Sequence, residues 1–394
     1  MRQSFCFRPE KEFGKPNTYT QAEIDAGADK WIAVPPGSFI NTTHNRGATR
    51  INTAGAKIWD TVAYGQLTGS FEWTFMLDYN YLEPFYFLFE DFSETANEHV
   101  YAKKNNGRIK SFTIRRKMLN TIAGGPEGMD EMEDVYGCVA RNLSFSKAAG
   151  SSQISVRITG FFVDERMVTG TLEATDYTEY RGELAEFLCM FVGDNASDTL
   201  ADCDYVANTD SLEISIENNS EAIYNTCSPF ASQYYEGITN YAFSTSCYSN
   251  NPDHYKRRVY TGGNALANRP LSKGMKPLAK IILVAYNSTA REYDTTSGEP
   301  PVTTHVEDYD VTAADIKAAV ARSSKTLTFD ISDCVIRSLT WPKGDGSKIM
   351  DNISSAECRK ITMTVKNAGY VADPTDYENS GIRNRIISEE PTSI

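Results

Sequence analysis

The sequence predicts a mainly β protein that contains two copies of one domain, with little helix in either copy. Apolar and polar residues alternate, as they do in a strand with one buried face, in four separate stretches of the 394-residue chain. Nearly the same ten residues also occur twice, 196 positions apart (334 minus 138). A duplicated sheet domain explains both observations.

The length and composition agree with this prediction. A chain of 394 residues exceeds the size at which a single core stops growing, so two domains are expected. Hydrophobic residues make up 41% of the chain and aromatic residues 11%, which is enough to fill two cores. The net charge of −13 argues against a protein that grips nucleic acid, because such proteins usually carry a basic patch.

Four stretches predict strands, and each has apolar residues at every second position. They are Phe71/Trp73/Phe75/Leu77, Ile154/Val156/Ile158, Leu212/Ile214/Ile216 and Leu327/Phe329/Ile331.

Two stretches predict helices. Residues 79–92 follow a strand directly and are apolar on several sides, so we expect a short buried helix or turn with Pro84 near its start. Residues 311–324 predict a surface helix, because Thr312 can cap it and Ile316, Ala319 and Val320 form an apolar stripe.

The repeated decapeptide is CVARNLSFSK at residues 138–147 and CVIRSLTWPK at residues 334–343. Its alternation predicts a half-buried strand near the end of each copy. We expect Arg141 and Arg337 to share a face with apolar neighbours, where each needs a carboxylate or carbonyl partner inside the domain or in another subunit. The equivalent positions that we single out as structural, and as candidates for a subunit interface, are Cys138, Arg141, Leu143, Phe145, Cys334, Arg337, Leu339 and Trp341.

Other features recur in the same order in both halves of the chain, including a strand with basic residues, a polar excursion and a closing strand. We therefore place the first domain at residues 1–170 and the second at residues 205–394, with an inserted loop and helix at about 289–325. The seam, residues 171–204, contains one apolar run, Phe187–Val192, which can form a strand in either domain.

No catalytic, cofactor or metal site is expected. The four histidines stand outside any catalytic motif, and the eight cysteines form no CxxC pair, so we interpret the cysteines as free thiols. The acidic stretch Gly128–Asp134 lacks the spacing of a calcium loop, and we expect it to be a solvated loop. The N-terminal stretch has no apolar region typical of a signal peptide, and no run is long enough for a membrane helix.

The order of these segments resembles that of a known protein family. GSFEWTFMLDYNYLEPFYFLF is followed by a charged strand, an acidic loop and YGCVARNLSFSKAAGSSQISVRITG. This order is similar to that of phage tail tube proteins, also called major tail proteins, in which a G-C-x-x-x-x-L-S-x-S strand precedes a small-residue turn and a closing strand. Residues 205–367 look like a second unit, although DGSKIMDNISSAEC replaces the short turn and a helix is inserted near Val311.

The resemblance implies a β-sandwich or split-barrel domain of the tail tube type. It further implies a structural virion protein without cofactors, which stacks as rings into the tube that delivers double-stranded DNA to the host cell. Because such rings are typically six-fold, we expect two domains per chain to give a homotrimer with pseudo-hexameric symmetry. The expected partners are the chain itself, the tape measure, terminator and tail-tip proteins and, in a contractile tail, the sheath. The expected location is the virion tail, after assembly in the host cytoplasm.

DNA would then be cargo without specific binding, and we expect a net negative inner wall that repels phosphates. Two alternatives stay open. One is a single-ring tail component, such as a distal tail, tail terminator or tail-tip protein. The other, of a different class, is a carbohydrate-binding adhesin of tandem β-sandwiches, which would need exposed, clustered tryptophans.

Overall fold

The computed structural model describes residues 2–25, 31–34, 37–51, 61–79, 81, 83–89, 91–95, 98–102, 109–119, 131–148, 150–151, 153–168, 184–185, 187–193, 197–205, 209–248, 278–286, 313–323, 325–340, 350–358, 360–367 and 386–387. These residues form a mainly β protein, as predicted, in which nineteen strands belong to one network of antiparallel pairings.

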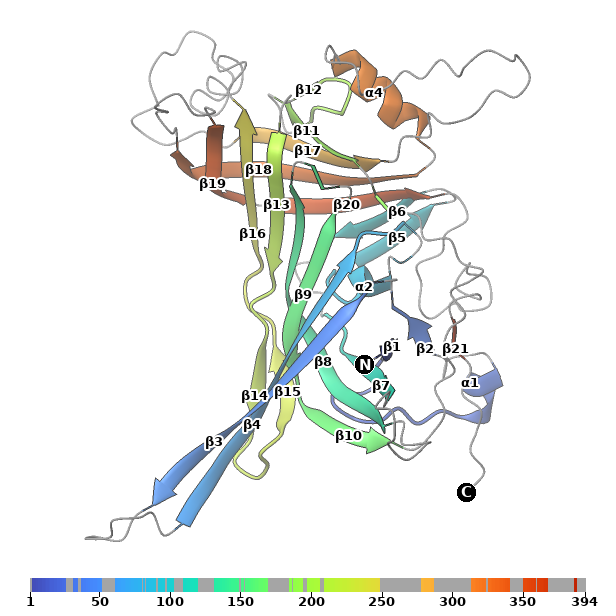
Figure 1. Cartoon of the computed structure of the whole chain (residues 1–394), viewed down its shortest axis with the longest axis vertical. Helices are drawn as coiled ribbons and strands as arrows, with labels where there is room; N and C mark the ends of the chain where they lie inside the picture. The colour runs from blue at the N-terminus through green and yellow to red at the C-terminus, as the bar shows by residue number, and fades with distance from the viewer. Residues whose placement is uncertain are drawn as a thin grey trace.

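The central feature is a long sheet of eight strands, most of which run lengthwise in Figure 1. Their order is β3–β4–β9–β8–β13–β16–β19–β18. The strands are β3 (Phe39–Ile51), β4 (Thr61–Met76), β8 (Glu131–Ala148), β9 (Ser155–Phe162), β13 (Thr209–Glu217), β16 (Asn240–Tyr248), β18 (Lys325–Thr340) and β19 (Met350–Cys358).

Strands β8 and β18 are long enough to leave this sheet and enter two smaller sheets, which lie toward opposite ends of the molecule (Figure 1). The first has the order β21–β2–β1–β7–β8–β10. Its other strands are β1 (Arg2–Pro9), β2 (Trp31–Ala33), β7 (Phe112–Leu119), β10 (Asp164–Val168) and β21 (Ile386–Ile387).

The second smaller sheet has the order β12–β11–β17–β18–β20–β6–β5. Its other strands are β5 (Asp91–Thr95), β6 (Glu98–Ala102), β11 (Phe187–Gly193), β12 (Asp204–Tyr205), β17 (Leu278–Tyr286) and β20 (Lys360–Asn367). The apolar run in the predicted seam is thus strand β11, and it pairs with β17 of the C-terminal half.

A separate hairpin of β14 (Glu221–Tyr224) and β15 (Ala231–Tyr235) extends the β13–β16 pair. It packs against the N-terminal half through Tyr234, whose ring lies 4.9 Å from that of Phe13. The Leu67 N–H of β4 also donates to the Pro229 carbonyl, at 3.0 Å.

The core follows from the strand alternation. Every apolar residue that predicted the four strands is at most 2% exposed. Burying one such side chain contributes about 1.5–3 kcal/mol. The buried cluster is continuous across both halves of the chain, and the rings of Phe145 and Phe329, 4.6 Å apart, lie where the halves meet.

The two predicted helices are confirmed. Helix α4 (Ala313–Arg322) packs Ile316 and Val320 into a small cluster with Phe191 and Tyr286, while Thr312 lies outside the described residues. Helix α2 (Glu83–Tyr86) is short and buried, with Pro84 in its first turn. In the described part of the chain, we find no helix long and apolar enough to cross a membrane.

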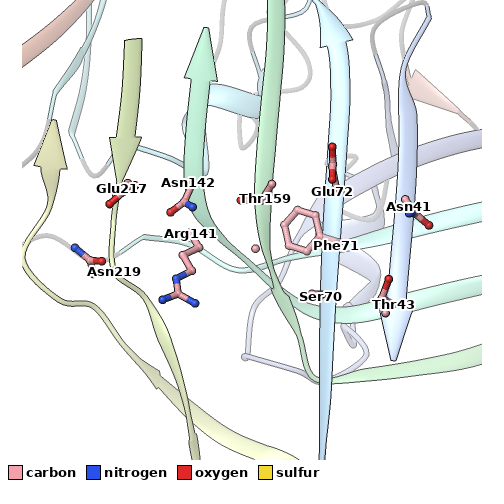
Figure 2. A pocket seen from close by; sticks show the side chains of 11 residues that line it. Asn41, Thr43, Ser70, Phe71, Glu72, Arg141, Asn142, Thr159, Glu217 and Asn219 are labelled. Carbon is pink, nitrogen blue, oxygen red and sulfur yellow. The ribbon is translucent and has the colours of Figure 1, made fainter. Parts of the chain in front are cut away.

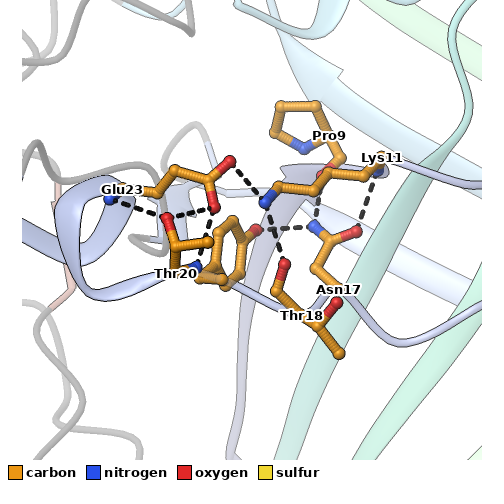
Figure 3. Close-up of polar contacts among 7 residues, drawn as sticks. Pro9, Lys11, Asn17, Thr18, Thr20 and Glu23 are labelled. Carbon is orange, nitrogen blue, oxygen red and sulfur yellow. Dashed lines mark hydrogen bonds and ion pairs between the residues drawn. The ribbon is translucent and has the colours of Figure 1, made fainter.

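The sequence did not predict helix α1 (Gln21–Asp25), which is held by a capping box (Figure 3). The Thr20 N–H donates to Glu23 Oε2 at 2.8 Å, and the Glu23 N–H donates to Thr20 Oγ1 at 3.4 Å. Lys11 Nζ donates to Glu23 Oε1 at 2.6 Å and to the Thr18 carbonyl at 2.8 Å. These contacts fold the segment after β1 onto the helix.

The prediction that Gly128–Asp134 is a solvated loop is wrong for its last four residues. Residues 131–134 begin strand β8, and Asp134 is only 1% exposed. Its carboxylate accepts hydrogen bonds from Arg115 Nε at 2.5 Å and Arg115 Nη2 at 2.7 Å. The buried Arg115 on the neighbouring strand therefore stabilises these residues as part of a paired strand.

Candidate assembly surface

The long sheet has two open edges in the described structure. Strand β3 pairs only with β4, and residues 335–340 of β18 pair only with β19. Such edges present rows of free backbone N–H and C=O groups, which are templates for pairing with another chain. Both edges belong to the same sheet, so the sheet can be extended on either side.

The strand order within the long sheet recurs. The sheet contains two sets of four neighbouring strands, β3–β4–β9–β8 and β13–β16–β19–β18. If the strands of each set are numbered along the chain, both sets have the sheet order 1-2-4-3. The smaller sheets contain β1–β7–β8 and β11–β17–β18 in matching places. The two sets of four join where β8 pairs with β13, with Phe145 opposite Ile214 and Leu143 opposite Ile216.

Cys138 and Cys334 mark the points at which the two long strands change sheets. Cys138 pairs with Phe112 of the smaller sheet, and the next residue, Val139, already pairs within the long sheet. Cys334 pairs with Leu278, and Val335 then pairs within the long sheet. The repeated decapeptide thus begins at the same topological point in both halves.

The side chains of Cys138, Leu143 and Phe145 are at most 1% exposed. Burial raises the pKa of the Cys138 thiol well above its usual value, so this thiol is packed as a small apolar group. Arg337 and Leu339 also lie in β18, and Trp341 lies outside the described residues.

The expectation that Arg141 shares the apolar face of its strand is wrong. The pairing of β8 with β9 shifts register between Ala140 and Asn142, which places a β-bulge at Arg141. The extra residue breaks the alternation, so Arg141 is exposed while Leu143 returns to the core. The guanidinium therefore needs no buried partner.

Arg141 instead lines an open hollow of about 420 Å³ on the polar face of the long sheet (Figure 2). A row of polar residues crosses strands β3, β4, β9, β8 and β13 there. Its members, in that order, are Asn41, Glu72, Thr159, Asn142 and Glu217. Glu72 accepts hydrogen bonds from Arg157 at 2.8 and 3.0 Å. This ion pair leaves Glu217 and Arg141 as the other charged groups that line the hollow.

A second pair of equivalent residues, which the sequence motifs above did not single out, lies four positions before each cysteine. Asp134 in β8 binds Arg115, and Asp330 in β18 lies 2.8 Å from Lys280 Nζ. Each partner stands on the neighbouring strand, β7 or β17. Extending the repeat by four residues toward the N-terminus would have identified both aspartates, because 134 and 330 also differ by 196.

The described residues contain no group of three or more His, Cys, Asp and Glu side chains that could hold a metal ion. His44 faces Glu165, and His254 and His305 lie outside the described residues. Cys138 and five other cysteines are free thiols: Cys6, Cys189, Cys203, Cys227 and Cys358. No protein-family model matches the chain, and no curated protein matches it.

Proposed function

We propose that this chain is the subunit of a viral tail tube, a structural protein whose rings stack into a conduit for double-stranded DNA. The observation that carries the proposal is the β8–β13 pairing inside one chain. It joins two four-strand sets of the same order and leaves β3 and β18 as open edges. Because β3 takes the place of β13 and β18 the place of β8, one chain's β18 can pair with the next chain's β3.

Repetition of that contact favours a closed ring. Three copies of an eight-stranded sheet would give 24 strands, which have a circumference of at least ~115 Å and a diameter of at least ~37 Å at the usual strand spacing of ~4.8 Å. Barrels of 16–18 strands already hold a water-filled channel, so the bore would be wide. A homotrimeric, pseudo-hexameric ring is therefore part of the proposal.

The polar face of the long sheet has the chemistry that a DNA conduit needs. Its apolar face is buried in the core, so in a closed ring the polar face would line the bore. Among the described side chains that line its hollow, most are uncharged, and Glu72 and Arg157 neutralise each other. Glu213 and Glu217 are exposed on the same side of β13, and these two carboxylates outnumber Arg141, which supports a weakly negative wall that holds no phosphate.

The recurring strand order also supports our division of the chain into two tandem tail-tube-like domains, residues 1–170 and 205–394. The pairing of β11 with β17 supports a start of the second unit near residue 187, inside the seam of residues 171–204. The proposed partners are other copies of the chain, the tape measure, terminator and tail-tip proteins and, for a contractile tail, the sheath. We place the protein in the virion tail, without enzymatic activity.

A single-ring tail component built on the same domain would have the same lateral edges but would not polymerise. A carbohydrate-binding adhesin is less well supported, because Trp31 and Trp73 are both fully buried and Trp59 and Trp341 lie outside the described residues.

Negative-stain microscopy of the purified protein tests the proposal. Hollow tubes with a bore wide enough for duplex DNA are expected, whereas rings that never stack would favour the single-ring alternative. Monodisperse monomers that bind a glycan would overturn the proposal.

A further inference from the structure

A cluster of four ionisable side chains ties the open edge strand β3 to three strands of the first smaller sheet. Arg116 of β7 lies at its centre. Its Nε donates to Glu133 Oε2 of β8 at 2.6 Å, its Nη1 donates to Thr42 Oγ1 of β3 at 2.7 Å, and its Nη2 donates to Glu165 Oε1 of β10. The imidazole Nε2 of His44, also on β3, contacts the other Glu165 oxygen.

The cluster is shielded from water. The side chains of Glu165, Glu133 and Arg116 are 5%, 13% and 17% exposed, and only His44 is substantially open, at 41%. The rings of His44 and Phe162 pack edge to face, with 4.9 Å between their centroids. Charges at this depth interact more strongly than at a surface, so the number of bound protons matters.

The charges balance only if the cluster holds one extra proton. Two ionised carboxylates and one guanidinium sum to −1, since the guanidinium is always charged. Burial, followed by the neighbouring Glu133, raises the pKa of Glu165 to about 8. A proton bound there brings the sum to zero and removes the repulsion between the two carboxylates.

We infer that Arg116, Glu133, Glu165 and His44 form a proton-dependent latch that holds edge strand β3 in place for pairing with the next copy of the chain. The role in pairing rests on the proposed tube function, whereas the latch itself does not. The latch reaches β3 through Thr42 and His44, its contacts on the edge strand.

The direction of the effect follows from the proton balance. With β3 in place, burial keeps a proton on the cluster, whereas release of β3 would expose the carboxylates to water and return the pKa of Glu165 toward its ordinary value of about 4.3. Opening therefore releases a proton, and it becomes more favourable as the pH rises from about 4.3 to about 8 and levels off above that. The latch should be closed under mildly acidic conditions and loose under alkaline conditions.

The neighbouring charges do not replace the latch. Arg166, next to Glu165 on β10, binds Asp164 at 2.6 Å and is exposed. Arg46, two residues beyond His44 on β3, is also exposed. Asp134, next to Glu133 on β8, is held by Arg115.

Amide hydrogen exchange of the full-length, unassembled protein tests the latch. After correction for the intrinsic rate, the protection of residues 41–46 should fall roughly tenfold per pH unit between pH 6 and pH 8. E165Q, which is neutral at every pH, should make this protection independent of pH. E72Q removes a carboxylate of β4, the strand beside β3, that does not belong to the latch. The protection in E72Q should therefore keep the wild-type dependence on pH.

The Thr42→Val variant distinguishes a local effect of the latch on β3 from a loss of stability of the whole protein. Loss of the Arg116 bond to β3 should lower the protection of residues 41–46 at every pH and leave that of β7 and β8 unchanged. A wild-type protection that does not vary with pH, or an E165Q protein with the wild-type slope, would overturn the inference.

Assembly provides the second arm. Rings are expected to form faster at pH 6 than at pH 8.5 for the wild-type protein and at equal rates for E165Q. Rings with the same rate at both pH values would overturn the role of the latch in pairing. If no rings form at either pH, the proposed function fails, while the exchange experiment still decides whether the latch exists.

Discussion

Glu10, immediately after β1, is a single residue that binds two segments far from it in sequence. Its carboxylate accepts hydrogen bonds from the Gly137 N–H at 2.6 Å, the Gly14 N–H at 3.0 Å and the Thr113 hydroxyl at 2.9 Å. Gly137 has a positive φ of 69° and stands next to Cys138, where β8 changes sheets. Glu10 therefore fixes the crossing point.

We predict that Glu10 makes stability depend on pH. Burial raises its pKa to about 7, despite the hydrogen bonds, which act in the opposite direction. The folded state thus holds a proton that the unfolded state releases, so the free energy of unfolding falls as the pH rises from about 4.5 to about 7. In E10Q the slope in that range should be smaller by up to about 1.4 kcal/mol per pH unit.

Urea unfolding from pH 4.5 to pH 7.5 measures this slope. E12Q is the matched control, since Glu12 is exposed and its ion pair, with Lys15, is exposed too. Equal slopes for E10Q and the wild-type protein would show that Glu10 is ionised in the folded state throughout.

The equivalent aspartates of the two halves should differ in importance. Asp134 is 1% exposed and binds Arg115 through two bonds, whereas the side chain of Asp330 is 40% exposed and has Lys280 as its partner. D134N leaves a buried guanidinium without its counter-charge, which costs about 3–5 kcal/mol. D330N should cost less, about 1 kcal/mol, because water screens the Asp330 carboxylate, although the Lys280 side chain is only 11% exposed.

Chemical denaturation of both variants at neutral pH checks this difference. Equal losses would mean that burial does not set the strength of these ion pairs.

At the scale of elements, the long strand β8 connects the sheets, and its close approach to β9 depends on a glycine. A Cβ added at Gly160 would lie 2.1 Å from the Val139 carbonyl oxygen and 2.6 Å from the Phe71 ring. The two strands could not keep their spacing with such an atom between them.

We therefore predict that G160A lowers the free energy of unfolding by roughly 3 kcal/mol, the upper end for overpacking a core. G150A is the control in the turn after β8. Its φ of +76° disfavours alanine, but an added Cβ would meet nothing within 4 Å, so a loss of about 1 kcal/mol is expected. Thermal unfolding of both variants gives the comparison, and a milder effect for G160A would mean that β8 and β9 can move apart.

At the scale of the whole molecule, the β8–β13 pairing predicts where neighbouring chains meet. Ser144 lies opposite Ser215 on the polar face, within one chain. The corresponding positions across two chains are Thr43 of β3 and either Ser338 or Thr340 of β18. Opposite residues in antiparallel strands have Cβ atoms about 5 Å apart, within reach of a short thiol cross-linker.

T43C combined with S338C or T340C should give cross-linked dimers and trimers on a denaturing gel, in only one of the two combinations because register is fixed. S144C with S215C should cross-link within a single chain and is the positive control. T43C alone controls for the native cysteines, of which Cys227 is exposed. Absence of higher bands in both combinations, in a sample that contains rings, would exclude β18–β3 pairing.

The sequence by itself determined four of the strands and which of their residues are buried. Alternation placed all four predicted strands correctly, since a strand with one buried face must alternate. The apolar stripe of Ile316 and Val320 likewise determined helix α4. These features depend on local periodicity, which can be recognised in the sequence without knowing which elements lie beside each other.

Only the tertiary structure decided what lies beside each strand. The bulge at Arg141 depends on the register with β9, and the burial of Asp134 depends on Arg115 from another strand. The latch brings together residues 42, 44, 116, 133 and 165 from four strands. Such contacts join positions far apart in the chain, so local periodicity carries no information about them, and only the pairing of the strands brings them into contact.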